Sequence, residues 1–213
     1  AAPMFERYAA NAAKAEERPR GYYFAGNCYR LLGRDREAVG AFKKVIEDPA
    51  GALFVPQSKV ALGHLAVNAG KLQEALSQFE EVVNSPFPPK VRGEAALNAA
   101  LTATKLDKTE LSERYLALIM RTPGMEDFRV EAQTALMANH FAKKEYKEVI
   151  NVFRGSTAKA EGDKEAARLM IAARSHMRLK QPSEALTLFR EVERLVKPET
   201  DLAFQASYYR LLC

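Results

Sequence analysis

A single apolar pattern recurs along the chain at a nearly constant interval. Each occurrence begins with a residue that is usually small, continues four positions later with a large apolar residue, and ends three positions after that. Successive first members lie 37, 37, 37 and 36 positions apart. The first, second and third members are, in chain order, Ala38, Ala75, Ser112, Val149 and Ala185; Phe42, Phe79, Leu116, Phe153 and Phe189; and Val45, Val82, Ile119, Ser156 and Val192. Ser156 interrupts the series, which predicts that its helix ends early.

The spacing i, i+4, i+7 places the three members on one face of an α-helix, whereas a strand would alternate every second residue. Another apolar segment with small residues near its middle precedes each occurrence, and a short turn joins the two. Gly33 and Gly70 lie in two of these turns and suit a left-handed helix end, and Pro182 suits the first turn of a helix. Each repeat is therefore a predicted helix–turn–helix. The preceding segments span residues 21–32, 57–69, 91–105, 127–142 and 164–179.

A single helical hairpin cannot bury both of its apolar faces, whereas stacked hairpins bury them against each other. The sequence therefore predicts an all-α fold, a right-handed α-solenoid of about five repeats that forms one domain over residues 1–213. We expect the first helix of each repeat to line the concave side. Residues 1–17 are expected to be a partial repeat or a cap helix, and residues 200–213 the start of a further repeat or a cap. The predicted repeats span 19–52, 56–86, 91–122, 126–156 and 163–196.

Two stretches carry the most specific motif, "YYFAGNCYRLLGRDREAVGAFKKVIEDP" and "KVALGHLAVNAGKLQEALSQFEEVV". Both contain a first helix with a central glycine, a turn glycine, and an Ala–x–x–x–Phe–x–x–Val second helix, and the first stretch also has the large–x–x–small–Gly pattern. The chain thereby resembles the tetratricopeptide repeat (TPR) family, in a bacterial type with repeats of 36–37 residues. The resemblance covers nearly the whole chain. The segments 93–122 and 128–156 are degenerate, because they lack the turn glycine and part of the motif.

The resemblance implies a non-catalytic scaffold that binds a peptide or a partner-protein segment in its concave groove. An alternative is that the chain is the TPR domain of a larger protein and mediates self-assembly or the docking of a catalytic or membrane module. Repeats of this length are similar to those of bacterial envelope-associated TPR proteins. The compartment therefore stays open between the cytoplasm and the periplasm or envelope.

The concave positions of the first helices supply the candidate partner-binding residues. They combine amides with cations, and we expect an acidic or carboxylate-ending peptide to bind them through charge-assisted hydrogen bonds. Some TPR proteins bind chaperone tails through Lys and Asn residues, but Tyr23 stands where that cluster has lysine. The candidates are Arg20, Tyr23, Asn27, Arg30, Gln57, His64, Asn68, Asn98, Lys105, Asn139, Lys143, Arg174 and Arg178. The apolar residues Val60 and Leu101 belong to the same predicted inner wall.

Composition narrows the classes of partner. The 32 basic and 27 acidic residues are mixed along the chain, so no basic arm for nucleic acid is expected despite the net charge of +5. No window approaches the roughly 18 uninterrupted apolar residues of a membrane span. Cys28 and Cys213 lie far apart and suggest no disulfide framework. Apolar residues near residue 213 predict self-association through the ends: Tyr208, Tyr209, Leu211 and Leu212.

Catalytic and metal chemistry has no candidate residues in this sequence. His64, His140 and His176 fall in the first helices of different repeats, and none has a second histidine or a cysteine at ligand spacing. Motifs of zinc proteases, serine hydrolases and phosphate-binding loops are missing as well. The carboxylates share helical faces with Lys and Arg, as solvated surfaces do. We therefore expect neither an enzyme nor a cofactor.

Overall fold

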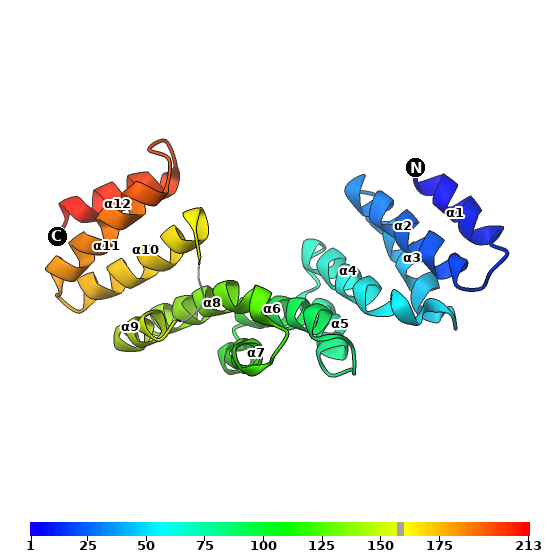
Figure 1. Cartoon of the computed structure of the whole chain (residues 1–213), viewed down its shortest axis with the longest axis horizontal. Helices are drawn as coiled ribbons and strands as arrows, with labels where there is room; N and C mark the ends of the chain where they lie inside the picture. Colours follow the sequence, from blue (N-terminus) through cyan, green and yellow to red (C-terminus); the bar gives the residue numbers. More distant parts are fainter. Residues whose placement is uncertain (157–159) are drawn as a thin grey trace. The chain divides into compact units, whose positions relative to one another are not determined.

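The structure is a computed structural model that describes residues 1–156 and 160–213. Within these ranges the chain forms twelve α-helices and two short 3-10 helices, without a strand. The predicted all-α fold of paired helices is thereby confirmed (Figure 1). None of the described helices combines the length and apolar character needed to cross a bilayer. Contacts group the chain into an N-terminal unit, Ala1–Lys108, and a C-terminal unit, Thr109–Cys213.

The N-terminal unit begins with an unpaired second-type helix, which is followed by two complete helix pairs and a further first helix. Each helix packs on the next one along the chain, and α4 also contacts α6. The predicted repeat boundaries themselves stay predictions. The helices are α1 (Ala2–Ala10), α2 (Glu17–Leu31), α3 (Asp35–Glu47), η1 (Gly51–Leu53), α4 (Val55–Asn68), α5 (Leu72–Val83) and α6 (Pro89–Lys105).

The C-terminal unit has the same alternation of first and second helices. Its α9 is only 9 residues long, and it ends just before Ser156, the residue that interrupts the apolar series. The helices are α7 (Thr109–Arg121), η2 (Glu126–Phe128), α8 (Arg129–Ala142), α9 (Tyr146–Arg154), α10 (Gly162–Arg178), α11 (Pro182–Leu195) and α12 (Asp201–Leu211).

The recurring apolar positions form the cores of both units. The five first members are fully buried or nearly so, and most of the second and third members are fully buried. Phe153, on the short α9, is the partly buried exception among the second members. The pattern therefore marks the helical face that packs on the neighbouring first helices, as its spacing predicts.

Two glycines of the first helices receive the large rings of the second helices. A Cβ at Gly26 would lie 2.8 Å from the Phe42 ring, and one at Gly63 would lie even closer to the Phe79 ring. Real Cβ atoms do not approach this closely, so each Phe ring packs directly on helix backbone. The glycines thus lower helix propensity but make room for the largest side chains of the core.

All five turns between paired helices have the same backbone geometry. One residue in each turn has a positive φ, and these residues are Gly33, Gly70, Asp107, Lys144 and Lys180. They keep the interval of the apolar pattern, although only two of them are glycine. The amide of the next residue donates to a carbonyl five residues back at 2.9–3.0 Å in every turn. The degenerate repeats therefore retain the turn with non-glycine residues in a conformation that disfavours side chains.

Candidate functional site

A polar pocket of about 280 Å³ lies between α2 and α4 and is reached by one side chain of α6. We call it the α2–α4 pocket. Tyr23, Asn27 and Arg30 follow one face of α2, because they are spaced by four and three residues. The facing stripe of α4 has the same kind of spacing. The complete lining is Tyr23, Asn27, Arg30, Gln57, Val60, Ala61, His64 and Glu94.

Aromatic packing holds the wall of this pocket in place. The Tyr23 ring stacks on Phe54 with centroids 5.1 Å apart and also contacts Phe42. The His64 ring meets Phe79 edge to face at 5.5 Å. The Asn27 amide donates from Nδ2 to the Tyr23 carbonyl at 3.1 Å. These contacts restrict the rotamers of Tyr23, Asn27 and His64 in the pocket wall.

The ionisable side chains of the pocket differ in whether they have a partner of opposite charge. The His64 Nε2 lies 4.0 Å from a Glu94 carboxylate oxygen. Burial is the main reason that the pKa of His64 lies below its ordinary 6.5; Glu94 opposes this shift, and Arg30 adds to it. Arg30 is exposed and has no ion-pair partner among the residues that the structure describes. The lowered pKa therefore favours the neutral imidazole of His64, and Arg30 is available to a ligand.

Five of the thirteen predicted binding residues meet in this pocket, together with the predicted inner-wall residue Val60. Glu94 is not among the residues predicted from the sequence, which include no acid. A signal was present, since steps of 37 residues lead from Arg20 to Gln57 and from Gln57 to Glu94. The third repeat was instead represented by Asn98, which lies one turn later on α6.

The remaining candidates in the N-terminal unit lie outside the α2–α4 pocket. The Asn98 amide donates to the Glu94 carbonyl at 2.8 Å, so it binds its own helix. Asn68 and Lys105 are exposed at the ends of α4 and α6. Arg20 lines a different pocket, between α1 and α2.

The candidates in the C-terminal unit are largely engaged in structural contacts. Asn139 is 5 % exposed and donates to the Ser112 hydroxyl at 3.1 Å. Lys143 binds Glu113 at 2.8 Å. The Arg174 guanidinium lies 4.8 Å from the Phe141 centroid and 5.2 Å from the Tyr209 centroid. Arg178 is exposed near the end of α10. Whether any of the thirteen residues binds a partner stays a prediction.

The histidines outside the pocket have structural partners. His140 Nδ1 lies 2.7 Å from a Glu145 carboxylate oxygen, and His176 Nδ1 lies 2.7 Å from the Gln181 amide oxygen. Both contacts join the end of a first helix to the start of the second. In the part of the chain that the structure describes, no three His, Cys, Asp or Glu residues converge as metal ligands would. The residues present offer recognition by hydrogen bonds and charge.

Comparison with known proteins agrees with this geometry. Residues 22–49 match the tetratricopeptide repeat family. No curated protein matches the sequence. Among solved structures, the fold is similar to the crystal structure of YrrB, described as a TPR protein with an unusual peptide-binding site. The two share 18% sequence identity and a TM-score of 0.67, over 98% of this chain and 100% of YrrB. Residues 22–49 are thus a tetratricopeptide repeat, and the chain that surrounds them has the fold of a tetratricopeptide-repeat protein.

Proposed function

We propose that this protein is a non-catalytic interaction module that binds an extended peptide segment with acidic or C-terminal carboxylate character in the α2–α4 pocket. A protein-interaction role agrees with the fold and with the description of YrrB as peptide-binding. The observation that carries the finer proposal is the exposed, available Arg30 beside the amides of Asn27 and Gln57 in one pocket.

The chemistry of the pocket suits a peptide better than a compact metabolite. Amide side chains donate to and accept from a peptide backbone, and a guanidinium binds a carboxylate through two parallel hydrogen bonds. Glu94 lies close to His64. It would repel a second carboxylate there and favour a backbone N–H or a cationic group. The bound segment therefore has a direction, with its acidic group at Arg30.

Fluorescence anisotropy with two labelled peptide pools tests this proposal. One pool carries Asp and Glu at alternate positions, and the other carries Lys and Arg. We expect the acidic pool to bind more tightly, and Arg30→Ala to weaken that binding about tenfold or more, since hydrogen bonds to charged groups contribute about 1.5–3 kcal/mol.

Arg190→Ala is the matched control, because Arg190 is an exposed arginine of α11 that lies outside the α2–α4 pocket. This variant removes the same charge and should bind like the unmodified protein. Equal affinity of both pools for all three proteins would rule out the proposal.

A second candidate function is self-assembly, in which the chain is the TPR domain of a larger protein and joins copies of it. It is favoured by an exposed apolar stripe on α12, where Phe204, Tyr208 and Leu211 are spaced by four and three residues. Sedimentation equilibrium over a hundredfold range of concentration distinguishes the two functions. A mass that rises with concentration supports self-assembly, whereas a constant monomer rules it out.

A further inference from the structure

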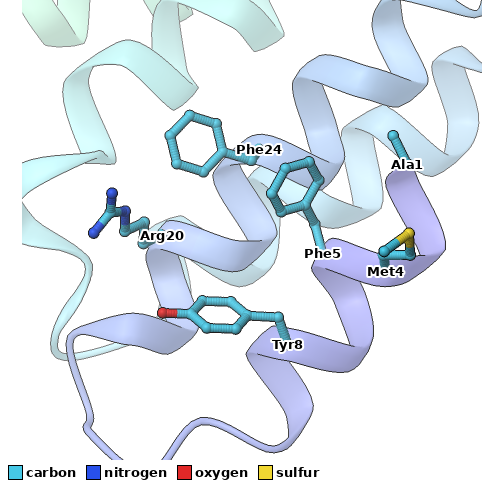
Figure 2. A pocket seen from close by; sticks show the side chains of 6 residues that line it. All are labelled: Ala1, Met4, Phe5, Tyr8, Arg20 and Phe24. Carbon is cyan, nitrogen blue, oxygen red and sulfur yellow. The ribbon is translucent and has the colours of Figure 1, made fainter.

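A further pocket of the N-terminal unit, of about 510 Å³, is formed by α3, α4 and α5. It is distinct from the α2–α4 pocket and from the pocket between α1 and α2 that Figure 2 shows. We call it the α3–α5 pocket. Helices α3 and α5 both pack on α4, so α4 provides the floor of the pocket and the other two helices provide its walls. Its volume lies within the range of about 300–1,000 Å³ that is usual for ligand pockets.

The floor of the α3–α5 pocket is an apolar stripe of α4. Leu62, Leu65, Ala66 and Ala69 lie at i, i+3, i+4 and i+7, which is the spacing of one helical face. Leu62 is only partly buried, as is Val39 of the α3 wall. The floor therefore presents apolar surface with the spacing on which a further helix packs, and its two alanines allow that helix to approach closely.

The two walls of the pocket differ in charge. On α3, Arg36 and Lys43 are exposed and form no ion pair with a described residue. The acid of this wall, Asp35, lies in the first turn of α3, where the helix dipole stabilises it. At the α5 wall, Lys71 and Glu74 pair with each other at 3.4 Å. The α3 wall therefore offers two cations to a ligand, whereas the charges of the α5 wall largely cancel.

The basic wall is a property of α3 and does not follow from the repeat pattern. Steps of 37 residues lead from Arg36 to Gln73 and from Lys43 to Glu80. The next second helix thus has an amide and an acid at the positions where α3 has two cations. The combination of an apolar floor with a basic wall is therefore local to the α3–α5 pocket, as expected of a binding surface.

We propose that the α3–α5 pocket binds an amphipathic helix of a partner protein, with its apolar face on α4 and its acidic side chains toward α3. A helix recognises an apolar groove through a stripe of side chains, and complementary charges set its orientation. Arg36 and Lys43 are seven positions apart, or about 10.5 Å along α3. A ligand helix that lies along α3 therefore meets both cations with carboxylates seven positions apart.

This surface is separate from that of the proposed function. The α4 residues that line the α3–α5 pocket differ from those that line the α2–α4 pocket. The extended peptide and the amphipathic helix therefore do not compete for the same side chains, and the N-terminal unit can hold both at once.

A set of synthetic helical peptides tests the ligand pattern. Each peptide carries leucines at i, i+3, i+4 and i+7 in an Ala/Gln background, with two glutamates three, four, seven or eleven positions apart beside the leucines. Fluorescence anisotropy should show the tightest binding at a separation of seven. Lysines in place of the glutamates, or serines in place of the leucines, should weaken binding at least about tenfold. A central proline, which breaks the helix, should weaken it similarly.

The double variant Arg36→Glu/Lys43→Glu tests the α3 wall. It should weaken binding of the glutamate peptide at least about tenfold and should favour the lysine peptide, because like charges then face each other across the interface. Lys147→Glu/Arg190→Glu is the matched control. These two residues are exposed and keep the repeat register of Arg36 and Lys43 on α9 and α11, so the net charge changes equally. Circular dichroism confirms that both double variants fold.

The inference predicts that Lys147→Glu/Arg190→Glu and Arg30→Ala both bind the glutamate helix like the unmodified protein. An equal loss in the two double variants would show that net charge alone drives binding, which overturns the inference. A loss in Arg30→Ala would place the helix in the α2–α4 pocket, with the same consequence. Undiminished binding of the proline peptide would also overturn it, since the ligand would then be extended.

Two further results bear on the occupant. A mass that rises with concentration and returns to monomer in Arg36→Glu/Lys43→Glu would assign the pocket to a second copy of the chain and overturn the inference. Failure of the proposed function is distinguishable, because Arg30→Ala would then leave the binding of extended acidic peptides unchanged while the glutamate helix still requires the α3 wall.

Discussion

The N-terminal and C-terminal units carry the same repeat but use the polar positions of their first helices differently. In the N-terminal unit, Arg30 borders the α2–α4 pocket beside Gln57 and forms no ion pair with a described residue. In the C-terminal unit, the Arg174 guanidinium lies within 5.2 Å of two aromatic centroids, and Asn139 is buried against Ser112. Partner recognition is therefore expected from the N-terminal unit, because a side chain that already stabilises the fold is costly to redirect to a ligand.

The two units also differ in the residue types at the positions where the backbone is most constrained, beneath the Phe rings and in the turns. The complete repeats of the N-terminal unit place glycine beneath a Phe ring and glycine in the turn. In the C-terminal unit, Lys144 and Lys180 hold the left-handed turn position instead. The comparison shows that the repeat preserves its geometry even where the preferred residue has been replaced, since the surrounding hairpin imposes it.

The largest expected effect comes from filling the space beneath a ring. Gly63→Ala should lower the free energy of unfolding by about 1–3 kcal/mol, because the new Cβ overlaps the Phe79 ring. Gly40→Ala is the matched control, since a Cβ there meets nothing within 4 Å. It should raise stability by about 0.5–1 kcal/mol, as alanine favours helix. Urea denaturation followed by circular dichroism measures both. Equal effects of the two substitutions would contradict the close packing on Gly63.

The next prediction compares an asparagine of a first helix in each unit, Asn139 and Asn27. Asn139→Ala should lower the free energy of unfolding by about 1–2 kcal/mol, because it removes a buried hydrogen bond to Ser112. Asn27→Ala should change stability by less than about 0.5 kcal/mol, since Asn27 is only half-buried and binds its own helix. Asn27→Ala should instead weaken binding of acidic peptides. Urea denaturation measures both variants. A larger loss of stability in Asn27→Ala than in Asn139→Ala would contradict the structural role assigned to Asn139.

A smaller, stabilising effect is expected at the turns. Lys180 has a φ of 58°, a conformation that glycine adopts without steric cost. Lys180→Gly should therefore raise the free energy of unfolding by about 0.5–1 kcal/mol, and Gly70→Ala should lower it by about 1 kcal/mol. Thermal and urea denaturation of both variants check the pair. A loss of stability in Lys180→Gly would show that the lysine side chain matters more than the backbone strain.

The smallest expected effect is a pH dependence at the α2–α4 pocket. Burial lowers the pKa of His64 in the folded state, so the unfolded chain binds more protons as the pH falls below about 6.5. His64 therefore contributes a loss of stability on acidification, through the window between its unfolded and folded pKa values. His64→Gln should reduce the loss of stability between pH 7 and pH 5. Urea denaturation at both pH values measures it, and an unchanged difference would exclude His64 as its source.

The sequence supported the fold prediction because the relevant information is local and repeated. Ala38, Phe42 and Val45 lie on one helical face through their spacing alone, and every later repeat adds an independent instance. The resemblance to tetratricopeptide repeats rested on the same residues. The early end of α9 was also predictable, because Ser156 interrupts a stripe that is otherwise apolar.

The candidate site was only partly accessible to the same reasoning. The periodicity predicted which residues of α2 and α4 face the concave side, and the structure brings five of the named candidates together in one pocket. It gave no means of separating Arg30 from Arg174, since both are arginines of first helices that the sequence predicts to face the concave side. Only the neighbouring Phe141 and Tyr209, far from Arg174 in sequence, distinguish them.

The sequence by itself determined the helical hairpins, their interval and the face of each helix that is buried, because these follow from backbone periodicity and local hydrophobic spacing. The tertiary structure alone decided that Glu94 shares a pocket with His64 and that Asn139 is buried. The exposure and the charge environment of a side chain depend on residues that other helices bring to it, and this neighbourhood is created by packing.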